Sequence, residues 1–363
     1  MSTTKLILVI GATGAQGLAI IDALLAPRHR REPFSLRYPA GQRALELRAR
    51  GVECVQGTFY SQRYYFLIHS FLISTGSFED QEAVAKALIG VYGVYVNTDG
   101  FTVGEIREIY AGMLIFEAAK KTKSLRHYVW SSVPYASKLA GFKPQYRAGH
   151  MNGKGLVADW LRGQPSTASK DGLAWSILET VMYTEMLAGG LLEPLNVRAD
   201  GTVVFAVPMG DSKFPLVTLK DIGWWARYTF DYRAETSGQD LAIASHVVGF
   251  DEIVKTFIEV TGKPAVYKPQ TLEEWWNNFG PHVNSFIGSG SMTIKQNFSG
   301  LWNTVGGGLG RRDMDWIRSV HPGTQSLEDW MRETKYTGGG STTLKSREDH
   351  GNWGLKEDVV RKL

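Results

Sequence analysis

The sequence predicts an α/β protein with a doubly wound parallel sheet and a smaller α+β part at its C-terminal side. Short apolar runs alternate with amphipathic runs through the first half of the chain, beginning with KLILVI at 5–10 and AQGLAIIDALLA at 15–26. A glycine-rich turn, GATGAQG, joins these two runs, and the regular alternation ends after about residue 185. Strands that alternate with helices at this spacing indicate a parallel sheet with helices on both faces.

Each predicted element has a local reason. Continuous apolar runs indicate strands that are buried on both faces of a sheet, whereas an apolar residue every three or four positions indicates a helix. Gly51 ends a predicted helix, because a glycine just past the last turn adopts the left-handed conformation that closes helices. The strands are predicted at 5–10, 33–36, 52–55, 91–97, 127–132 and 173–179, and the helices at 15–26, 41–51, 79–90, 105–121 and 154–163. Beyond residue 185, short strands are predicted within 201–217, a helix from Leu219, a further sheet strand at 241–245, a helix and a strand within 250–269, and a helix at 272–279.

The turn GATGAQG carries the first functional signal. Gly11, Gly14 and Gly17 follow a buried strand and open a helix. In a dinucleotide-binding fold the first glycine permits the tight turn, the second lets the backbone approach the pyrophosphate, and the third lets helix and strand pack closely. The helix N-terminus adds N–H groups and a favourable dipole for phosphate. A tight turn alone is the alternative, but its place at the start of a strand–helix alternation favours a nucleotide site.

The end of the second strand indicates which nucleotide is bound. An acidic residue there would bind the ribose hydroxyls of NAD, and none is present because Glu32 precedes the strand. Arg37, with Arg43 nearby, suits the 2′-phosphate of NADP. One charge-assisted hydrogen bond contributes about 1.5–3 kcal/mol, which corresponds to a roughly ten- to hundredfold preference for NADP. The alternative is a solvated arginine after a strand.

These signals divide the chain into parts. Residues 1–185, with about 215–248 returning to them, are predicted to form a Rossmann-type NAD(P)-binding domain, and residues 186–335 a smaller substrate or partner domain. Residues 336–363 are polar and glycine-rich and predict a mobile tail. Residues 58–76 interrupt the passage from a strand to its helix and contain no Asp or Glu. We interpret them as an artefact of the gene model, such as translated non-coding sequence; the alternative is a genuine lipophilic loop or surface helix. Sequencing of the mature transcript decides between the two.

Composition and charge exclude several classes of protein. The net charge of +4 over 363 residues is weak and diffuse and no helix-turn-helix or zinc pattern is present, so no direct nucleic-acid binding is expected. No set of Cys and His has the spacing of metal ligands. The single cysteine, Cys54, permits no intrachain disulfide and fits a reducing compartment. The longest apolar stretch, 64–73, is about half a membrane span, and no signal peptide is visible. We therefore expect a cytoplasmic protein, with the basic run Arg28–Arg31 leaving nuclear import as an alternative.

The stretch GHMNGKG at 149–155 carries the second functional signal. A large class of nicotinamide enzymes has Tyr-x-x-x-Lys at such a place, where the tyrosine exchanges a proton while hydride moves and the lysine lowers the tyrosine's pKa. Here His150 stands in the tyrosine's position, four residues before Lys154. The stretch alone leaves open whether a substitute transfers the proton or the protein only holds the cofactor.

The glycine loop, Arg37 and HMNGKG together resemble the NmrA-like family, an atypical branch of the short-chain dehydrogenase/reductase superfamily. The resemblance covers about residues 5–335 apart from 58–76, and is also carried by VNTDGF, HYVWSSV, LETVMYTEML, DGTVVFAVPMGD, TLKDIG and TGKPAVYKP. It implies one of two functions. Some members are NADP-dependent reductases, many in fungal secondary metabolism, and others are NADP-binding regulators or redox sensors that bind transcription factors or other proteins. The histidine stands in place of the tyrosine in both kinds.

The resemblance also implies a role for each matching residue. Those at the cofactor are grouped by the part of the nucleotide that they would contact. Gly11, Ala12, Thr13, Gly14, Ala15 and Gln16 are implied at the pyrophosphate, with Gly17 completing the same loop, Arg37 at the 2′-phosphate, Gln81 near the adenine side, Asn97 and Thr98 facing the cofactor, Lys154 at the nicotinamide ribose, and Tyr183, Thr184, Glu185 and Met186 flanking the nicotinamide pocket.

An enzyme needs groups that manage charge and protons. Lys154 would orient the ribose and supply positive charge where an alkoxide develops, and His150, titrating near neutrality, would pass a proton. Ser131 or Ser132, at a strand end, would hydrogen-bond a substrate carbonyl. The alternatives are a surface lysine, a histidine packed at a helix start, and serines that end a strand and cap a helix. Tyr135 and Tyr183 are further proton donors, and Met182, Tyr183, Met186 and Leu187 would line an apolar substrate side.

A sensor needs only a bound cofactor whose state shifts a surface. The cluster Trp275, Trp276 and Phe279 is either such a partner face or the core of the smaller domain. The apolar substrate side favours an NADP-dependent oxidoreductase that acts on a small organic molecule, with a secondary metabolite as one candidate. The alternative is a non-catalytic NADP-binding redox sensor or transcriptional regulator that acts through protein partners. No membrane partner is expected.

Overall fold

The computed structural model describes residues 5–26, 34–37 (backbone), 46, 49–50, 52, 78–288, 290, 292–340 and 354–363. The apolar insert predicted at 58–76 lies outside these ranges, as do Arg43 and most of the helix predicted at 41–51.

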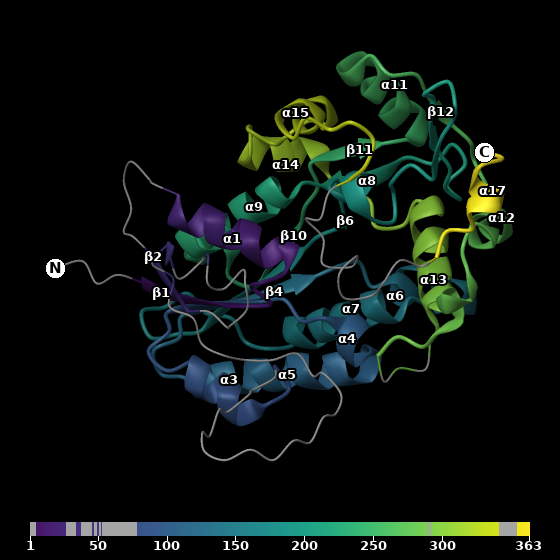
Figure 1. Ribbon diagram of the computed structural model, residues 1–363. Helices are drawn as coiled ribbons and strands as arrows, with labels where there is room; N and C mark the ends of the chain where they lie inside the picture. The colour runs from purple at the N-terminus through teal and green to yellow at the C-terminus, as the bar shows by residue number, and fades with distance from the viewer. Residues whose placement is uncertain are drawn as a thin grey trace, which may run out of the picture.

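A six-stranded parallel sheet is the main scaffold of the molecule (Figure 1). Its strands run in the order β10-β5-β4-β3-β1-β2, and every neighbouring pair is parallel. The chain begins at β1, builds one edge with β2, and then crosses back to β3 to build the other side. In such sheets ligands bind outside the carboxyl ends of the strands, at the point where the winding reverses. The strands are β1 (Lys5–Ile10), β2 (Phe34–Arg37), β3 (Gly93–Val96), β4 (His127–Ser132), β5 (Ala174–Glu179) and β10 (Gln239–Ala242).

Helices cover both faces of this sheet. On one face, Ile7 and Val9 of β1 share a buried cluster with α1 and α9, and on the other Leu8 and Val94 share one with α3, α5 and α7. Figure 1 shows α1 and α9 above the sheet and α3 and α5 below it. Since alternate residues of a strand point to opposite faces, strands buried on both sides must be apolar throughout, and the predicted doubly wound sheet is confirmed. The covering helices are α1 (Ala15–Leu25), α3 (Gln81–Ala87), α5 (Glu105–Lys121), α7 (Gly149–Arg162) and α9 (Leu219–Asp231).

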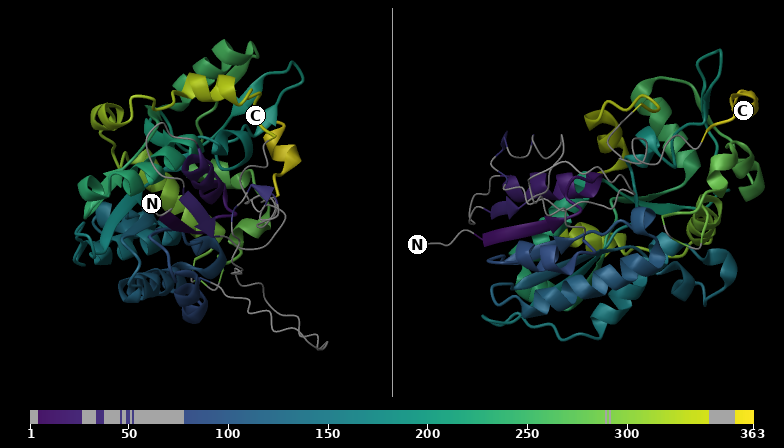
Figure 2. Two further views of the ribbon diagram at one scale, coloured as in Figure 1. Left: turned by 90° about the vertical axis from the view of Figure 1, so that its left-hand side faces the viewer. Right: turned by 60° about the horizontal axis from the view of Figure 1, so that its bottom comes forward.

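A second group of elements has its own core. Two three-stranded sheets, β11-β9-β6 and β12-β8-β7, pack with the helices of the last third of the chain. Trp275, Trp276 and Phe279 are buried in this core, so they are not an exposed partner face. In the right-hand view of Figure 2, most of the green and yellow segments lie at the end of the molecule away from the N-terminus. The strands are β6 (Met182–Tyr183), β7 (Asn196–Val197), β8 (Val203–Phe205), β9 (Phe214–Val217), β11 (His246–Val248) and β12 (Ala265–Tyr267). The helices are α8 (Met186–Gly189), α11 (Phe250–Thr261), α12 (Leu272–Asn277), α13 (Ile294–Gly306), α14 (Met314–Val320), α15 (Leu327–Glu333) and α17 (Glu357–Val360). Short helices elsewhere are α4 (Gly100–Val103), α6 (Ala136–Leu139), α10 (Arg233–Thr236), and the 3₁₀ turns η1 (Pro144–Tyr146) and η2 (Pro281–Asn284).

Helix α7 starts at Gly149, five residues before the predicted start at 154. Three glycines at 149, 153 and 155 argue against a helix by intrinsic propensity. Each of them faces a crowded neighbour, because a Cβ at Gly153 would stand 2.8 Å from Glu108 Oε2 and a Cβ at Gly155 2.4 Å from the Cβ of Tyr135. Tertiary packing therefore overrides propensity, and the stretch GHMNGK lies inside the helix.

The predicted mobile tail is wrong for residues 354–363. Gly280 N donates to Gly354 O at 2.7 Å, and Lys356 N donates to Asn278 O at 2.8 Å. Val360 of α17 is buried. Val360 is buried and Leu355, Val359 and Leu363 are partly buried, within a segment that is too short and too polar to show a periodic pattern.

Arg312 joins the edge of the main sheet to the last third of the chain. Its side chain is 1% exposed and lies 3.0 Å from the carboxylate of Glu179, the last residue of β5. Its Nε donates to Ile243 O, just beyond β10, at 3.0 Å. One buried guanidinium thus binds the carboxyl ends of two neighbouring strands.

Candidate functional site

The loop between β1 and α1 requires its glycines for steric reasons. Gly11 has a φ of 81°, in the left-handed region, and a Cβ there would stand 2.2 Å from Asn97 O. A Cβ on Gly17 would stand 2.3 Å from the Cα of Ala12. Gly14 is the N-cap of α1, and this cap makes no side-chain hydrogen bond. The helix start therefore presents backbone N–H groups and a positive dipole end at the carboxyl edge of the sheet, which suits a phosphate.

Lys154 is fixed at the same edge of the sheet. Its Nζ lies 3.2 Å from Asn97 Oδ1, 2.8 Å from Thr98 O and 3.2 Å from Thr98 Oγ1. Asn97 and Thr98 directly follow β3, whose neighbour β1 leads into the glycine loop. The structure thus brings together three of the predicted site residues, and their contacts hold the ammonium group beside the loop.

Glu108 is a site residue that the sequence did not reveal. It lies on α5, is fully buried, and forms an ion pair with Lys154 at 3.0 Å between Oε1 and Nζ. The same oxygen accepts a hydrogen bond from Thr98 Oγ1 at 2.7 Å. A Cβ on Gly100 would stand 2.2 Å from Oε2, so Gly100, like Gly153, leaves room for this carboxylate. The sequence gives no sign of this role for Glu108, because acids in the first turn of a helix are common for their favourable interaction with the helix dipole.

The two serines at the end of β4 differ in their surroundings. Ser131 is 2% exposed, and its Oγ donates to Gln16 Oε1 at 2.8 Å. Ser132 is buried as well, and its Oγ donates to Val133 O at 3.2 Å. Ser131 therefore ties β4 to the first turn of α1, and its predicted contact with a substrate carbonyl stays a prediction.

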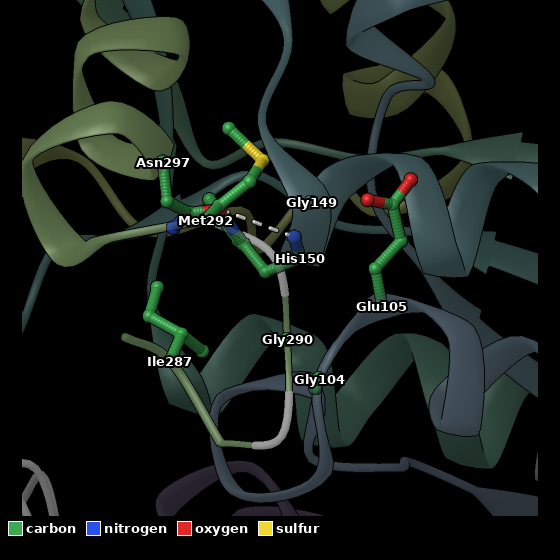
Figure 3. Close-up of a pocket in the computed structure, with 9 residues that line it drawn as sticks. Gly104, Glu105, Gly149, His150, Ile287, Gly290, Met292 and Asn297 are labelled. Atoms are coloured by element: carbon green, nitrogen blue, oxygen red, sulfur yellow. Dashed lines mark hydrogen bonds between the residues drawn. The ribbon is translucent and has the colours of Figure 1, made fainter. Parts of the chain in front are cut away.

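His150 lies one helical turn before Lys154 on α7, on the same face of the helix. Its Nδ1 lies 3.0 Å from Asn297 Oδ1 on α13 (Figure 3), and the ring of Phe101 stacks on it at 4.8 Å between centroids. Burial lowers the pKa of His150 to about 4; the bond to Asn297 opposes this shift, and the charge of Lys154 acts in the same direction as burial. The imidazole is therefore neutral at pH 7, and the prediction that it titrates near neutrality is wrong.

Residues Tyr183–Met186 link the two parts of the molecule. Tyr183 pairs with Val217 of β9, and Thr184 N donates to Val217 O at 3.0 Å. Burial raises the pKa of the Tyr183 hydroxyl, with a contribution from the charge of Asp99, which follows Thr98 at the sheet edge. Met186 contacts both the core of the second group of elements and the cluster around α1 and α9. Their predicted place beside a nicotinamide stays a prediction.

Glu185 is engaged by the protein itself. Its Oε1 accepts from Leu219 N, at the start of α9, at 3.1 Å and from Trp330 Nε1 at 3.2 Å. Burial raises the pKa of this carboxyl to about 7, although these hydrogen bonds oppose the shift. Glu185 therefore caps α9 with a carboxyl that burial makes harder to ionise.

The adenine side of the predicted site is defined by position only. Arg37 ends β2 in register with Leu8 of β1, and its side chain lies outside the described residues. Gln81 is the exposed first residue of α3, whose start is capped by Asp80. Their predicted contacts with the 2′-phosphate and the adenine stay predictions.

Among the described residues, no group of three or more His, Cys, Asp or Glu side chains could hold a metal ion. In the described part of the chain, every helix is too short or too polar to cross a membrane.

Comparison with known proteins gives consistent results. The sequence model of the NmrA-like family matches residues 3–300. An NmrA-like family domain-containing oxidoreductase of Aspergillus hancockii is 27% identical over 290 residues, which cover 77% of this chain and 79% of the relative. Another NmrA-like family domain-containing oxidoreductase, from Aspergillus sp., is 28% identical over 303 residues, which cover 80% of this chain and 81% of the relative.

Solved structures share the fold. NmrA, a negative transcriptional regulator, in complex with NADP aligns with a TM-score of 0.65 at 17% identity, over 92% of this chain and 95% of that one. Citrobacter sp. triphenylmethane reductase complexed with NADP(H) aligns with a TM-score of 0.61 at 16% identity, over 91% and 99%.

Proposed function

Since this chain belongs to the NmrA-like family, we propose that it is an NADP-dependent oxidoreductase that transfers hydride between the nicotinamide and a small organic molecule. Relatives named as oxidoreductases support the reaction class. NADP(H) complexes of proteins with the same fold support the cofactor. The observation that carries the proposal is the ammonium group of Lys154, held at the carboxyl edge of the sheet beside the glycine loop. The substrate class that we propose is a secondary metabolite, as the family resemblance of the sequence implies; the oxidoreductase relatives named above come from Aspergillus.

The residues present fit this cofactor. The crowded backbone at Gly11 and Gly17 and the uncapped start of α1 form a cradle that a pyrophosphate can approach. Lys154 would hold the nicotinamide ribose and Arg37 the 2′-phosphate. Bound NADP(H) would supply or accept the hydride.

The chain's own residues would manage charge during the reaction. Lys154 places a positive charge where an alkoxide develops on the substrate, which stabilises the transition state. Glu108 and Thr98 fix the ammonium in advance, so little reorganisation is needed at that moment. His150 is neutral at pH 7 and can accept a hydrogen bond, but it carries no imidazolium proton to deliver.

A titration with four nucleotides tests the proposal. The pure protein and its Lys154→Ala variant are titrated with NADPH, NADP⁺, NADH and NAD⁺ by fluorescence and calorimetry, and then assayed on carbonyl and enone substrates. We expect NADPH to bind roughly ten- to hundredfold more tightly than NADH, the scale of one charge-assisted hydrogen bond. The variant should lose turnover and at least part of its affinity. No binding of any of the four nucleotides would refute the proposal.

A non-catalytic NADP-binding redox sensor is the second candidate. The structure supports it in one respect, because His150 is neutral at pH 7 and Ser131 is engaged by Gln16, which leaves neither as an obvious proton donor. NmrA, a regulator, shares the fold. Tight binding of NADP⁺ without turnover of any substrate, together with capture of a protein partner that depends on the cofactor, would favour the sensor.

A further inference from the structure

Trp130 contacts Lys154 at both ends of the lysine. Its indole Nε1 donates to the backbone O of Lys154 at 3.1 Å, and the Lys154 ammonium lies over the same ring, 5.5 Å from its centroid. Trp130 belongs to β4 and is fully buried, whereas the Lys154 side chain is 13% exposed. One rigid ring system therefore contacts both the backbone and the charged end of a long, flexible residue.

Neither the helix nor the burial of the indole requires this hydrogen bond. Lys154 lies inside α7, where its carbonyl can accept from the N–H four residues later, so Trp130 uses the second lone pair of the oxygen. Ser132 Oγ also faces this oxygen, at 3.4 Å. The buried Nε1 atoms of Trp225 and Trp302 have no hydrogen-bond partner in the part of the chain that the structure describes. The bond from Trp130 to Lys154 is therefore a specific feature of this site.

Neighbouring elements hold the indole in place. A Cβ on Gly112 of α5 would stand 2.8 Å from Cη2 of Trp130, so a larger residue there would displace the ring. In the sheet, Trp130 is in register with Val96 of β3, the residue that precedes Asn97. The ring is thus fixed beside the strand end that supplies oxygens to the ammonium.

The ring constrains Lys154 in a way that the surrounding oxygens do not. Asn97, Thr98 and Glu108 contact the lysine only at Nζ. Trp130 contacts Nζ and also the backbone carbonyl next to the start of the side chain. The negative face of an indole attracts a cation, and the attraction is stronger where water is excluded. Since one side chain makes both contacts, they limit the directions in which the lysine can extend.

We propose that Trp130 is a positioning residue that directs the Lys154 ammonium to the carboxyl edge of the sheet. It is fully buried and acts through Lys154, which would meet the nicotinamide ribose and the substrate oxygen at that edge. The inference rests on the proposed function for what Lys154 does there. The contact between the two side chains does not depend on that function and can be measured without cofactor.

NMR of the protein labelled with ¹³C at the lysine Cε tests the contact. We expect one lysine signal to be shifted upfield by the ring current of the indole, and to disappear in Lys154→Met, which assigns it. The shift should be lost in Trp130→Leu and reduced in Trp130→Phe, which keeps a smaller ring. Trp302→Phe, a change of the same kind in the core of the second group of elements, is the control and should leave the signal in place.

Titration with NADPH tests the positioning role. Trp130→Phe removes the N–H, and Trp130→Leu removes the N–H and the ring face. We expect NADPH affinity to fall about threefold and about tenfold respectively, and in neither case by more than in Lys154→Met. In the Lys154→Met background both changes should cause no further loss, because Trp130 acts through the missing ammonium. Trp302→Phe should change NADPH affinity in neither background.

Two results would overturn the inference. One is an equal loss of NADPH affinity with and without Lys154, and the other is a Lys154 signal that no change at Trp130 moves; either would leave Trp130 as a core residue. If Trp130→Leu does not fold, Trp130→Phe and Lys154→Met complete the cycle on the hydrogen bond alone. Failure of the unmodified protein to bind NADPH would instead refute the proposed function, and the NMR result would still decide whether Trp130 holds Lys154.

Discussion

Replacement of Glu108 by glutamine removes the negative half of a buried ion pair and keeps its shape. The carboxylate is fully buried and lies 3.0 Å from Lys154 Nζ, a separation at which the Coulomb attraction is about 5–6 kcal/mol for an effective dielectric constant near 20. Desolvation offsets much of that attraction, and removal of one partner of a buried pair typically costs about 3–5 kcal/mol. Lys154 retains three oxygen acceptors on Asn97 and Thr98. We therefore expect Glu108→Gln to lower the free energy of unfolding by about 2–4 kcal/mol.

A double-mutant cycle isolates the pair. Glu108→Gln, Lys154→Met and the double variant are unfolded in urea and followed by tryptophan fluorescence. The double variant contains neither charge, so we expect it to be no less stable than the weaker single variant, with a coupling energy of about 2–4 kcal/mol. The exposed pair Glu82–Lys86, 2.7 Å apart one turn along α3, is the matched control and should couple by about 0.5 kcal/mol or less. Additive single effects, with coupling at Glu108 no larger than in the control, would show that the ion pair does not hold Lys154.

Three further predictions follow from burial and backbone crowding. Gly17→Ala should abolish NADPH binding and lower the free energy of unfolding by about 2 kcal/mol or more, because its Cβ would meet backbone at 2.3 Å. Gly163→Ala is the control: its nearest contact would be at 3.4 Å, so it should be neutral or slightly stabilising. Equal melting temperatures of the two variants would contradict this prediction. Burial lowers the pKa of His127 to about 3 and that of His246 to about 4, below the unfolded value of 6.5, so the unfolded chain binds more protons between these values. The contribution of the two neutral histidines to the free energy of unfolding is complete above pH 6.5. It is lost as the pH falls towards 4, by up to about 1.4 kcal/mol per pH unit for each histidine. A urea midpoint that does not change between pH 7 and 4 would refute this. Burial raises the pKa of Glu185 to about 7, so its ionisation opposes folding increasingly from pH 4.5 to 7. Glu185→Gln should therefore raise the free energy of unfolding by about 1–3 kcal/mol at pH 8 and leave it unchanged at pH 4. A decrease at pH 8 would show that the carboxylate is needed.

The parts of the fold that could be predicted from the sequence are those in which local pattern and tertiary environment agree. The strand at 127–132 and the helix at 105–121 have their predicted bounds, because the first is apolar enough for two buried faces and the second carries an apolar stripe. The glycine loop could be predicted equally well, because its three glycines are required by contacts within a few residues of the chain and with the residue that follows the neighbouring strand.

The rest of the site depends on contacts between distant segments. Asn297 contacts His150 across 147 residues of sequence, and no sequence pattern near either residue predicts this contact. The early start of α7 has the same origin, because Gly153 is explained by Glu108 on α5 and Gly155 by Tyr135 just before α6. The neutral state of His150 likewise comes from its burial, with Phe101 stacked on its ring, and the spacing of His150 and Lys154 gives no sign of it.

The position of Arg312 has a consequence for the order in which the molecule can be completed. During synthesis, β10 ends at Ala242, and about 70 more residues (242 to 312) must be added before the guanidinium exists. At about 5–20 residues per second, this interval lasts several seconds, during which the carboxylate of Glu179 lacks its buried partner. The edge of the main sheet is therefore finished late, by a residue that lies beyond position 300, where the family match ends. A ribosome stalled just past that match would carry a nascent chain whose nucleotide-binding loop is complete but whose last strand is not yet secured.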